Sequence, residues 1–280
     1  MPLHKKTYLC AIASKYEPST DMQERHKDRK QYFDELAETS EKYYIPYLTR
    51  FMPLDASTRV LEIGCGEGGN LKPFARLGCQ VIGVDISPSR IRQASAFFSE
   101  EGLPGMFINK DIFKADELVG TFDLILIHDV IEHIPFKKEL LQRVRLFLKP
   151  HGLAFFGFPV WQMPFGGHQQ ICQSHFCAHA PFIHLLPAPL YKALLRKCGE
   201  GDGNIDELLS IKQCRITIGR FQRLAQHERL RITDRQLWFI NPHYEIKFGL
   251  RPRKLVNILR YTPYVRNFLS SSAWYIVQRA

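Results

Sequence analysis

The sequence predicts an α/β fold in which helices cover both faces of a doubly wound, mainly parallel sheet. From residue 58 onwards, hydrophobic runs of strand length alternate with helix-compatible segments. The first run ends in a glycine-rich turn, Gly64 to Gly69, and a helix-compatible segment follows at once. That succession is typical of a nucleotide-binding βαβ unit. The 280 residues, 45% of them hydrophobic, are enough to bury such a core.

The N-terminal part is expected to be helical and to precede the sheet. Residues 1–18 show no clear periodicity. The stretch 22–51 has helical character and an aromatic stripe, and we expect two helices that meet near Thr39 and Ser40. Pro53 closes this segment before the first strand.

The alternation that follows is regular. The expected strands are 58–63, 80–84, 106–109, 122–127 and 153–158. The expected helices between them are 70–77, 88–100 and 136–148. Gly78 is suited to cap the end of the first helix, and Pro88 is suited to the first turn of the second.

The pattern changes after Pro159. Residues 160–187 are rich in His, Pro, Gly, Phe and Gln and show no clean period, so we expect a lid or substrate loop. Helices are expected at 188–197, 205–212 and 217–227, and strands at 231–240 and 272–278. Residues 241–269 are expected to be irregular, basic and aromatic.

These features divide the chain into three parts. Residues 1–52 would form an arm and helices that cover a cofactor. Residues 53–160 and 213–280 would form the nucleotide-binding domain, and residues 161–212 an inserted lid or substrate segment.

Composition favours an intracellular, cytoplasmic protein. No run approaches the roughly 18 apolar residues of a spanning helix, and the apolar patch at 8–13 is shorter than a signal-peptide core. Seven scattered cysteines form no disulfide framework. The net charge of +10 is compatible with nucleic acid, an anionic substrate or a membrane surface. A basic solvated surface explains it equally well, because no block of five like charges occurs.

The glycine turn alone leaves the nucleotide open. Gly64, Gly66 and Gly69 match the dinucleotide pattern G-x-G-x-x-G, whereas Gly64, Gly66 and Gly68 match G-x-G-x-G. Acidic residues decide between them. Glu62, two residues before the first glycine, suits an amine and would be unwelcome beside a pyrophosphate. Asp85 ends the second strand, where a carboxylate binds ribose hydroxyls.

The third strand adds Asp111 and Ile112, whose polar and apolar side chains could meet the amine and the face of an adenine. The fourth strand begins Phe122-Asp-Leu-Ile and leads into His128-Asp-Val-Ile-Glu-His133, and Leu148-Lys-Pro-His-Gly152 precedes the fifth. With these motifs in order, residues 40–160 resemble the class I S-adenosylmethionine-dependent methyltransferases. The chain looks most like the small-molecule group that includes the ubiquinone-type O-methyltransferases.

The resemblance implies a Rossmann-like seven-stranded sheet in the order 3-2-1-4-5-7-6, with strand 7 antiparallel. It also implies S-adenosyl-L-methionine as cofactor. The residues that would hold it are Glu62, Gly64, Cys65, Gly66, Gly68, Asp85, Ile86, Asp111, Ile112 and His128. His128 would lie beside the methionyl part. Tyr43 or Tyr44 would cover the cofactor, and plain helix packing is an equal alternative for both tyrosines.

The acceptor would lie outside the carboxyl ends of the strands. Tyr44 and Trp161 are the candidate acceptor contacts, and His168 and His133 are the candidate bases for a hydroxyl acceptor. Structural loop histidines are the alternative.

No metal is expected at this edge. Asp129, Glu132 and His133 would be the ligands if a hard divalent ion were bound. A zinc site built from the histidines and cysteines of 168–179 is disfavoured, because no second paired knuckle appears.

The sequence therefore predicts methyl transfer to a small or lipid-linked acceptor of the polysaccharide- or quinone-pathway type, on oxygen. Contact with a membrane surface stays open. No Asn/Asp-Pro-Pro-Tyr motif follows the fourth strand and no Pro-Cys nucleophile occurs, which argues against modification of DNA bases. The alternatives are an RNA 2′-O-methyltransferase, a non-catalytic S-adenosylmethionine-binding module and an NAD-dependent enzyme.

Overall fold

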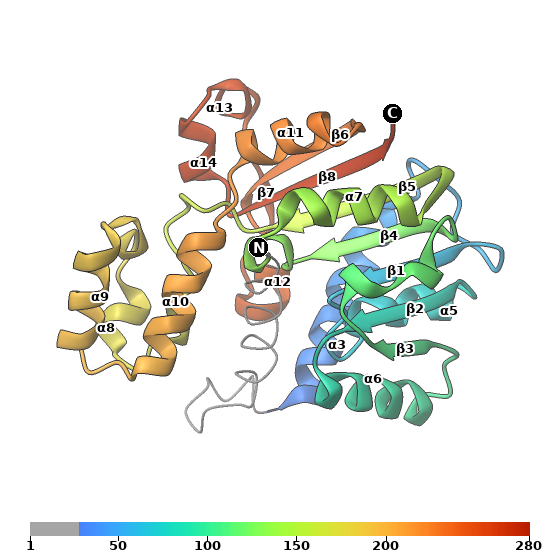
Figure 1. The fold of residues 1–280 in the computed structure, drawn as a ribbon, viewed down its shortest axis with the longest axis horizontal. Helices are drawn as coiled ribbons and strands as arrows, with labels where there is room; N and C mark the ends of the chain where they lie inside the picture. Colours follow the sequence, from blue (N-terminus) through green and yellow to red (C-terminus); the bar gives the residue numbers. More distant parts are fainter. Residues whose placement is uncertain (1–27) are drawn as a thin grey trace.

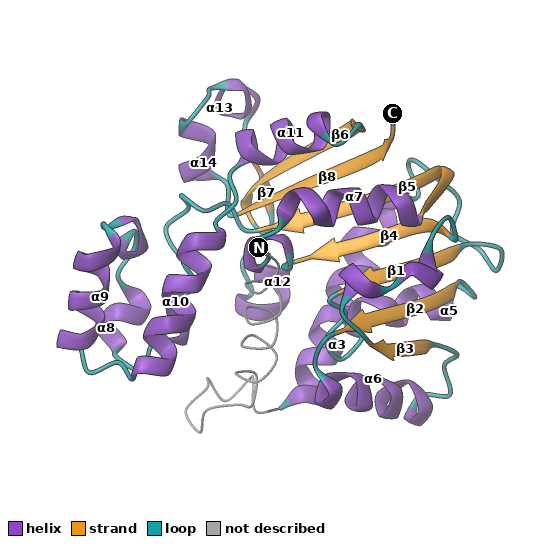
Figure 2. Ribbon diagram, viewed as in Figure 1, coloured by secondary structure: helices purple, strands orange, loops and turns teal. Residues whose placement is uncertain are grey.

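An eight-stranded sheet organises the computed structural model, which describes residues 28–280 (Figures 1 and 2). Its strand order is β3-β2-β1-β4-β5-β8-β6-β7. The strands are β1 (Arg59–Ile63), β2 (Gln80–Asp85), β3 (Met106–Asn109), β4 (Phe122–His128), β5 (Leu148–Phe158), β6 (Leu230–Ile240), β7 (Arg253–Lys254) and β8 (Ser272–Arg279).

The predicted strand order is confirmed. β1 to β5 run parallel, and β8 pairs antiparallel with both β5 and β6. β8 is the antiparallel seventh strand of the predicted order. The structure adds the two-residue edge strand β7, which pairs with β6 inside a stretch that we expected to be irregular.

Helices cover both faces of the sheet, because alternate residues of each strand point to opposite sides. On one face Leu61 packs with side chains of α7 (Lys137–Phe147) and α11 (Ile218–His227). On the other face Val60 packs with side chains of α3 (Arg29–Thr39), α4 (Ile45–Leu48), α5 (Lys72–Arg76) and α6 (Pro88–Glu100). The sheet therefore lies between two apolar layers.

The N-terminal helices meet where the sequence predicts, although the chain does not break there. Asp28 caps α3 by accepting a hydrogen bond from the Gln31 N–H. A π-helical turn, Ser40–Tyr44, then connects α3 directly to α4. Such a turn holds one extra residue, so it changes which side chains face the sheet. The part of the expected helix before residue 28 lies outside the described residues.

The lid is more helical than the sequence suggests. It contains α8 (His175–His179), α9 (Ala188–Lys197) and α10 (Asp202–Cys214), and α10 is longer than the expected 205–212. These helices have a small core of their own, which includes Cys177, Tyr191 and Leu195. Figure 1 shows the lid projecting beyond the edge where β1, β2 and β4 end.

The expectation of an irregular segment at 241–269 is wrong in part. Besides β7 it holds α12 (His243–Phe248), α13 (Asn257–Tyr261) and α14 (Val265–Leu269). All three helices are short, and isolated helices of that length are marginal, so helical periodicity is hard to detect in the sequence. No helix among residues 28–280 is long and apolar enough to cross a membrane.

Candidate active site

The turn after β1 is shaped by glycine. Gly64, Gly66 and Gly68 all have positive φ, at 71°, 53° and 84°. A Cβ at Gly64 would lie 2.5 Å from Cγ2 of Val130, on the loop that follows β4. The turn thus combines a left-handed backbone with close approach to a neighbouring loop, and both features exclude larger residues.

Glu62 is buried directly below this turn with half of its carboxylate unpaired. Asn70 Nδ2 donates a 2.7 Å hydrogen bond to Glu62 Oε1. Oε2 is buried and has no hydrogen-bond partner among the described residues. Burial raises the pKa of Glu62 to about 8, and the Asn70 hydrogen bond only partly opposes this. An ammonium group placed at Oε2 would satisfy the oxygen and favour its charge.

Asp85 is held at the end of β2 by two backbone groups. Its Oδ2 accepts from the Gly66 N–H at 3.0 Å, and its Oδ1 accepts from the Ser87 N–H at 2.8 Å. Each carboxylate oxygen keeps a further lone pair for a ligand. The side chain is therefore oriented between the glycine turn and α6, an orientation compatible with the predicted contact to ribose hydroxyls.

The same arrangement recurs after β3. Asp111 Oδ1 accepts from the Phe113 N–H at 3.0 Å, and this bond fixes the turn that places Ile112. Asp111 and Ile112 both line the pocket at this edge of the sheet. The two residues that we predict to contact an adenine therefore line the same cavity.

The pocket opens at the carboxyl ends of β1, β2 and β4. Its lining residues are Ile63, Gly64, Val84, Asp85, Ile86, Ser87, Arg90, Lys110, Asp111, Ile112, Phe113, Asp129, Val130, His133, Ile134 and Pro135. The sequence analysis did not assign Arg90, Lys110, Val130 or Ile134 to the site. Arg90 lies in the first turn of α6 after Ser87-Pro88, so the predicted helix start was the available signal for it.

His128 is fixed by its neighbours on both sides. Tyr44 OH lies 2.7 Å from His128 Nε2, and Asp129 Oδ2 lies 3.3 Å from Nδ1. Gly157 on β5 leaves room for the imidazole, because a Cβ there would collide with it. Tyr44 itself is 1% exposed, so the structure places it against His128 in the core rather than on the pocket surface.

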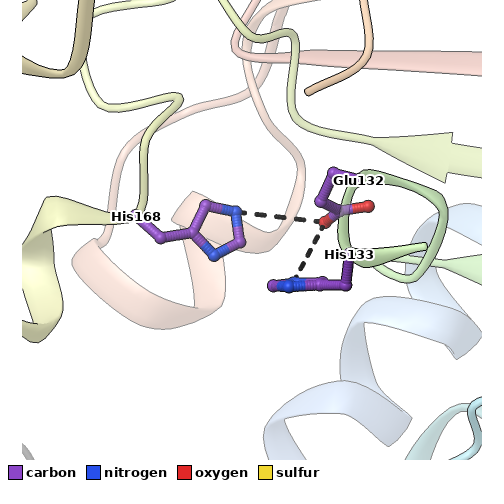
Figure 3. Close-up of side chains that lie close together, drawn as sticks. All are labelled: Glu132, His133 and His168. Carbon is purple, nitrogen blue, oxygen red and sulfur yellow. Dashed lines mark ion pairs between the residues drawn. The ribbon is translucent and has the colours of Figure 1, made fainter. Parts of the chain in front are cut away.

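Glu132, His133 and His168 form a cluster beside the pocket, which His133 lines (Figure 3). Glu132 Oε1 lies 3.8 Å from His133 Nε2 and 4.0 Å from His168 Nε2. The two imidazole rings are 5.0 Å apart between centroids and nearly perpendicular. His168 comes from the lid and His133 from the turn after β4, so the fold joins segments 35 positions apart in the sequence.

Burial controls the charge of this cluster. It raises the pKa of Glu132 well above its usual range, and the nearby Asp129 adds to the shift. It also lowers the pKa of His133 and of His168 below the ordinary imidazole value. Both imidazoles are therefore neutral near pH 7 and able to accept a proton. Neither Glu132 oxygen has a hydrogen-bond partner among residues 28–280.

Two further predicted residues, Cys65 and Trp161, do not line the pocket. Cys65 is 3% exposed and packs in the core between the sheet and α3 to α6. Trp161 is 6% exposed, and its carbonyl accepts a 2.8 Å hydrogen bond from the His184 ring. Asp129 lines the pocket with a left-handed φ of 52°, but it is not part of the Glu132–His133–His168 cluster.

The fold and the site together define a class. A buried acid, Glu62, precedes the glycine turn after β1, and a second acid, Asp85, ends β2. An antiparallel strand, β8, is inserted beside β5. The unpaired Oε2 of Glu62 fits the amino group of S-adenosylmethionine. These features define the class of proteins that have the Rossmann-like fold of S-adenosyl-L-methionine-dependent methyltransferases.

Comparison with known proteins gives the family. Residues 15–199 match the family described as methyltransferase domain, and the chain belongs to that family. A ubiquinone biosynthesis O-methyltransferase from Methylobacterium nodulans is 36% identical over 106 residues, which are 38% of this chain and 42% of that protein. One from Caulobacter vibrioides is 37% identical over 100 residues, or 34% and 38% of the two chains. The chain thus spans about two fifths of the length of these curated relatives.

Solved structures support the fold at low sequence identity. Magnesium protoporphyrin IX methyltransferase from Synechocystis superposes with a TM-score of 0.53 at 12% identity, covering 98% of this chain and 94% of that one. A methyltransferase from Clostridium acetobutylicum gives a TM-score of 0.57 at 12% identity, with 91% and 99% covered. The shared feature is the Rossmann-like methyltransferase architecture.

Proposed function

We propose that the protein transfers the methyl group of S-adenosylmethionine to a hydroxyl of a small or lipid-linked acceptor of the quinone- or polysaccharide-pathway type. The observation that carries this proposal is the cluster of two neutral imidazoles with Glu132 beside the pocket. Similarity to ubiquinone biosynthesis O-methyltransferases over the cofactor-binding part supports it. A cytoplasmic location, which rests on the odd and scattered cysteines, belongs to the same proposal.

The protein's own residues have separate tasks in this proposal. S-adenosylmethionine supplies an activated methyl group. Glu62 and the glycine turn hold its amino-acid part, while Asp85 and Asp111 with Ile112 hold the ribose and adenine. His133, which lines the pocket, takes the proton of the acceptor hydroxyl directly. His168, delivered by the lid, excludes water and polarises the same hydroxyl when the lid closes.

A metal-assisted version of the reaction is the second candidate. The Glu132 and histidine atoms are 3.8 and 4.0 Å apart, too far for hydrogen bonds but suited to ligands of one shared cation. A cation would also satisfy the two unpaired oxygens of Glu132. It would supply Lewis-acid activation of the acceptor oxygen.

Production of S-adenosylhomocysteine tests the proposal. The enzyme would be incubated with catechols, quinols, hydroxylated isoprenoid lipids, sugars and a short RNA. We expect turnover with a hydroxylated small molecule or lipid, and His133→Ala should lower kcat by about 10²- to 10⁴-fold, the usual worth of a general base. His151→Ala, at an exposed position of β5, is the matched control. Turnover with the RNA alone would overturn the small-molecule assignment.

Chelation separates the two versions of the mechanism. If activity survives treatment with EDTA, the imidazole acts as the base without a metal. If activity is lost and Mg²⁺ or Mn²⁺ restores it, the metal-assisted version holds, and Glu132→Gln should then abolish metal-induced thermal stabilisation.

A further inference from the structure

The segment between β6 and β8 exposes large apolar side chains over much of its length. They are Phe248, Leu250, Val256, Ile258, Tyr261, Tyr264, Val265 and Phe268, which we call the 248–268 surface. Ile258 is 78% exposed and Tyr264 82%. Single exposed apolar residues are common on proteins, but such a concentration within 21 positions marks an interaction site.

The charges in this segment all have one sign. Arg251, Arg253 and Lys254 are exposed among the apolar side chains. No Asp or Glu occurs from residue 246 to the end of the chain at 280. Within residues 248–268 the surface is therefore apolar and cationic, with Glu245 near Arg251 as the neighbouring acid, and a partner that is apolar and anionic fits it.

Two aromatic residues at this surface have a strained, left-handed backbone. Tyr264 has a φ of 64°, and Phe182 of the lid has a φ of 67°. A left-handed conformation is costly for a bulky residue and is kept where its surroundings require it. The Phe182 ring lies 6.3 Å from the ring of Phe268, so the lid joins the same surface. Exposed tyrosines are typical of the membrane–water interface.

The surface lies on the same edge of the sheet as the pocket. β6 and β5 are both antiparallel to β8, so β6 ends at the edge where the parallel strands end. The segment leaves β6 there and returns to the start of β8. In Figure 1, α13 and α14 accordingly lie on the same side of the sheet as the lid.

We propose that the 248–268 surface binds an anionic lipid bilayer. Aliphatic and aromatic side chains would enter the headgroup region while the three exposed cations meet lipid phosphates. A second copy of the chain fits less well, because a two-fold contact would set these cations against each other. Nucleic acid fits less well too, since the apolar side chains of Val256 and Ile258 would lie against phosphates, with which they make no favourable contact.

Vesicle co-sedimentation of the full chain tests this proposal without cofactor or acceptor. The probes are vesicles of phosphatidylcholine alone and of phosphatidylcholine with 30 mol% phosphatidylglycerol. We expect binding to the anionic vesicles, weakened by salt. Arg253→Glu/Lys254→Glu should lower the partition coefficient at least about tenfold, given the usual contribution of a cation near an anionic surface. Ile258→Ser/Tyr264→Ser should lower it at any salt concentration, because it removes inserted apolar groups.

Two variants outside the 248–268 surface serve as controls. Arg50→Glu/Arg92→Glu removes the same number of exposed cations, and Val119→Ser removes an exposed apolar residue from the loop before β4. Both should bind vesicles like the wild type, and circular dichroism would confirm that every variant is folded. The proposal is wrong if the wild type does not bind anionic vesicles at low salt, or if the control variants lose as much binding as the surface variants. It is also wrong if the wild type is a dimer that only Ile258→Ser/Tyr264→Ser dissociates.

The membrane proposal and the methyl-transfer proposal can fail separately. Vesicle binding without any turnover would leave the surface assignment intact, and turnover without vesicle binding would leave the acceptor assignment open to soluble molecules only.

Discussion

At the residue scale, Glu62 is a buried carboxyl group whose protonation state should control cofactor binding. Its pKa of about 8 means that the carboxyl is mostly protonated below pH 8 in the ligand-free protein. An ammonium ion binds the carboxylate form. S-adenosylmethionine binding should therefore release a proton from Glu62 and strengthen as the pH rises from 6 to 8, by up to about tenfold per unit.

Isothermal titration at several pH values, in buffers of different ionisation enthalpy, measures both effects. Glu62→Gln should weaken binding by about 10- to 100-fold, as expected for loss of a charged hydrogen bond, and should remove the pH dependence. Glu100→Gln, on an exposed position of α6, should change neither. A flat pH profile for the wild type would contradict the role given to Glu62.

Substitution of two buried tyrosines distinguishes an effect on cofactor binding from an effect on stability alone. Tyr44 is bonded to His128 at 2.7 Å, and Tyr47 donates a hydrogen bond of the same length to Asp234. Tyr44→Phe and Tyr47→Phe should each lower the free energy of unfolding by about 1 kcal/mol in urea denaturation. Only Tyr44→Phe should also weaken S-adenosylhomocysteine binding, because the sequence analysis predicts that its partner His128, unlike Asp234, lies beside the methionyl part of the cofactor. Equal affinity in both variants would argue that His128 is purely structural.

At the element scale, two glycines in regular structure should respond oppositely to substitution. Gly203 lies in the first turn of α10, and a Cβ there meets nothing within 4 Å. Gly203→Ala should therefore stabilise the protein by about 0.4–1 kcal/mol, since alanine loses less entropy on folding.

Gly157 on β5 has no such space, since a Cβ would meet the His128 ring. Gly157→Ala should cost about 1–3 kcal/mol and displace His128. Chemical denaturation shows whether each variant has a higher or a lower free energy of unfolding than the wild type. A destabilised Gly203→Ala together with a tolerated Gly157→Ala would refute the packing described for these two elements.

At the scale of the whole molecule, the lid and the sheet have separate apolar cores. The lid core around Tyr191 is small, whereas the sheet is packed on both faces. Because local opening depends on how much apolar surface is lost, hydrogen exchange should show the lid opening as one unit, well below the global free energy of unfolding.

Addition of S-adenosylhomocysteine should protect the turns after β1, β2 and β3 most strongly. Leu195→Ala should speed exchange throughout the lid and leave the sheet unchanged. Exchange that is uniform across lid and sheet would contradict this division of the chain.

The strands of the parallel sheet and much of the proposed cofactor site were predictable from local patterns, and the order of the strands followed from the family resemblance that those patterns carry. Apolar runs, a glycine turn and carboxylates at strand ends are features of neighbouring residues, so Glu62, Asp85 and Asp111 could be found without coordinates. Val130 and Ile134 could not be assigned, since a side chain on a loop reaches a pocket only through the packing of several elements.

By itself, then, the sequence determined the fold class and the acids proposed to bind the cofactor, because these depend on periodicity and on short motifs, and it implied the strand order through a family resemblance. Only the tertiary structure decided which distant residues meet. It joined His168 of the lid to Glu132 and His133, buried Tyr44 against His128, and gathered the exposed apolar residues of 248–268 on the edge that holds the pocket. Burial and proximity across the chain set these pKa values and surfaces, and no local pattern encodes either.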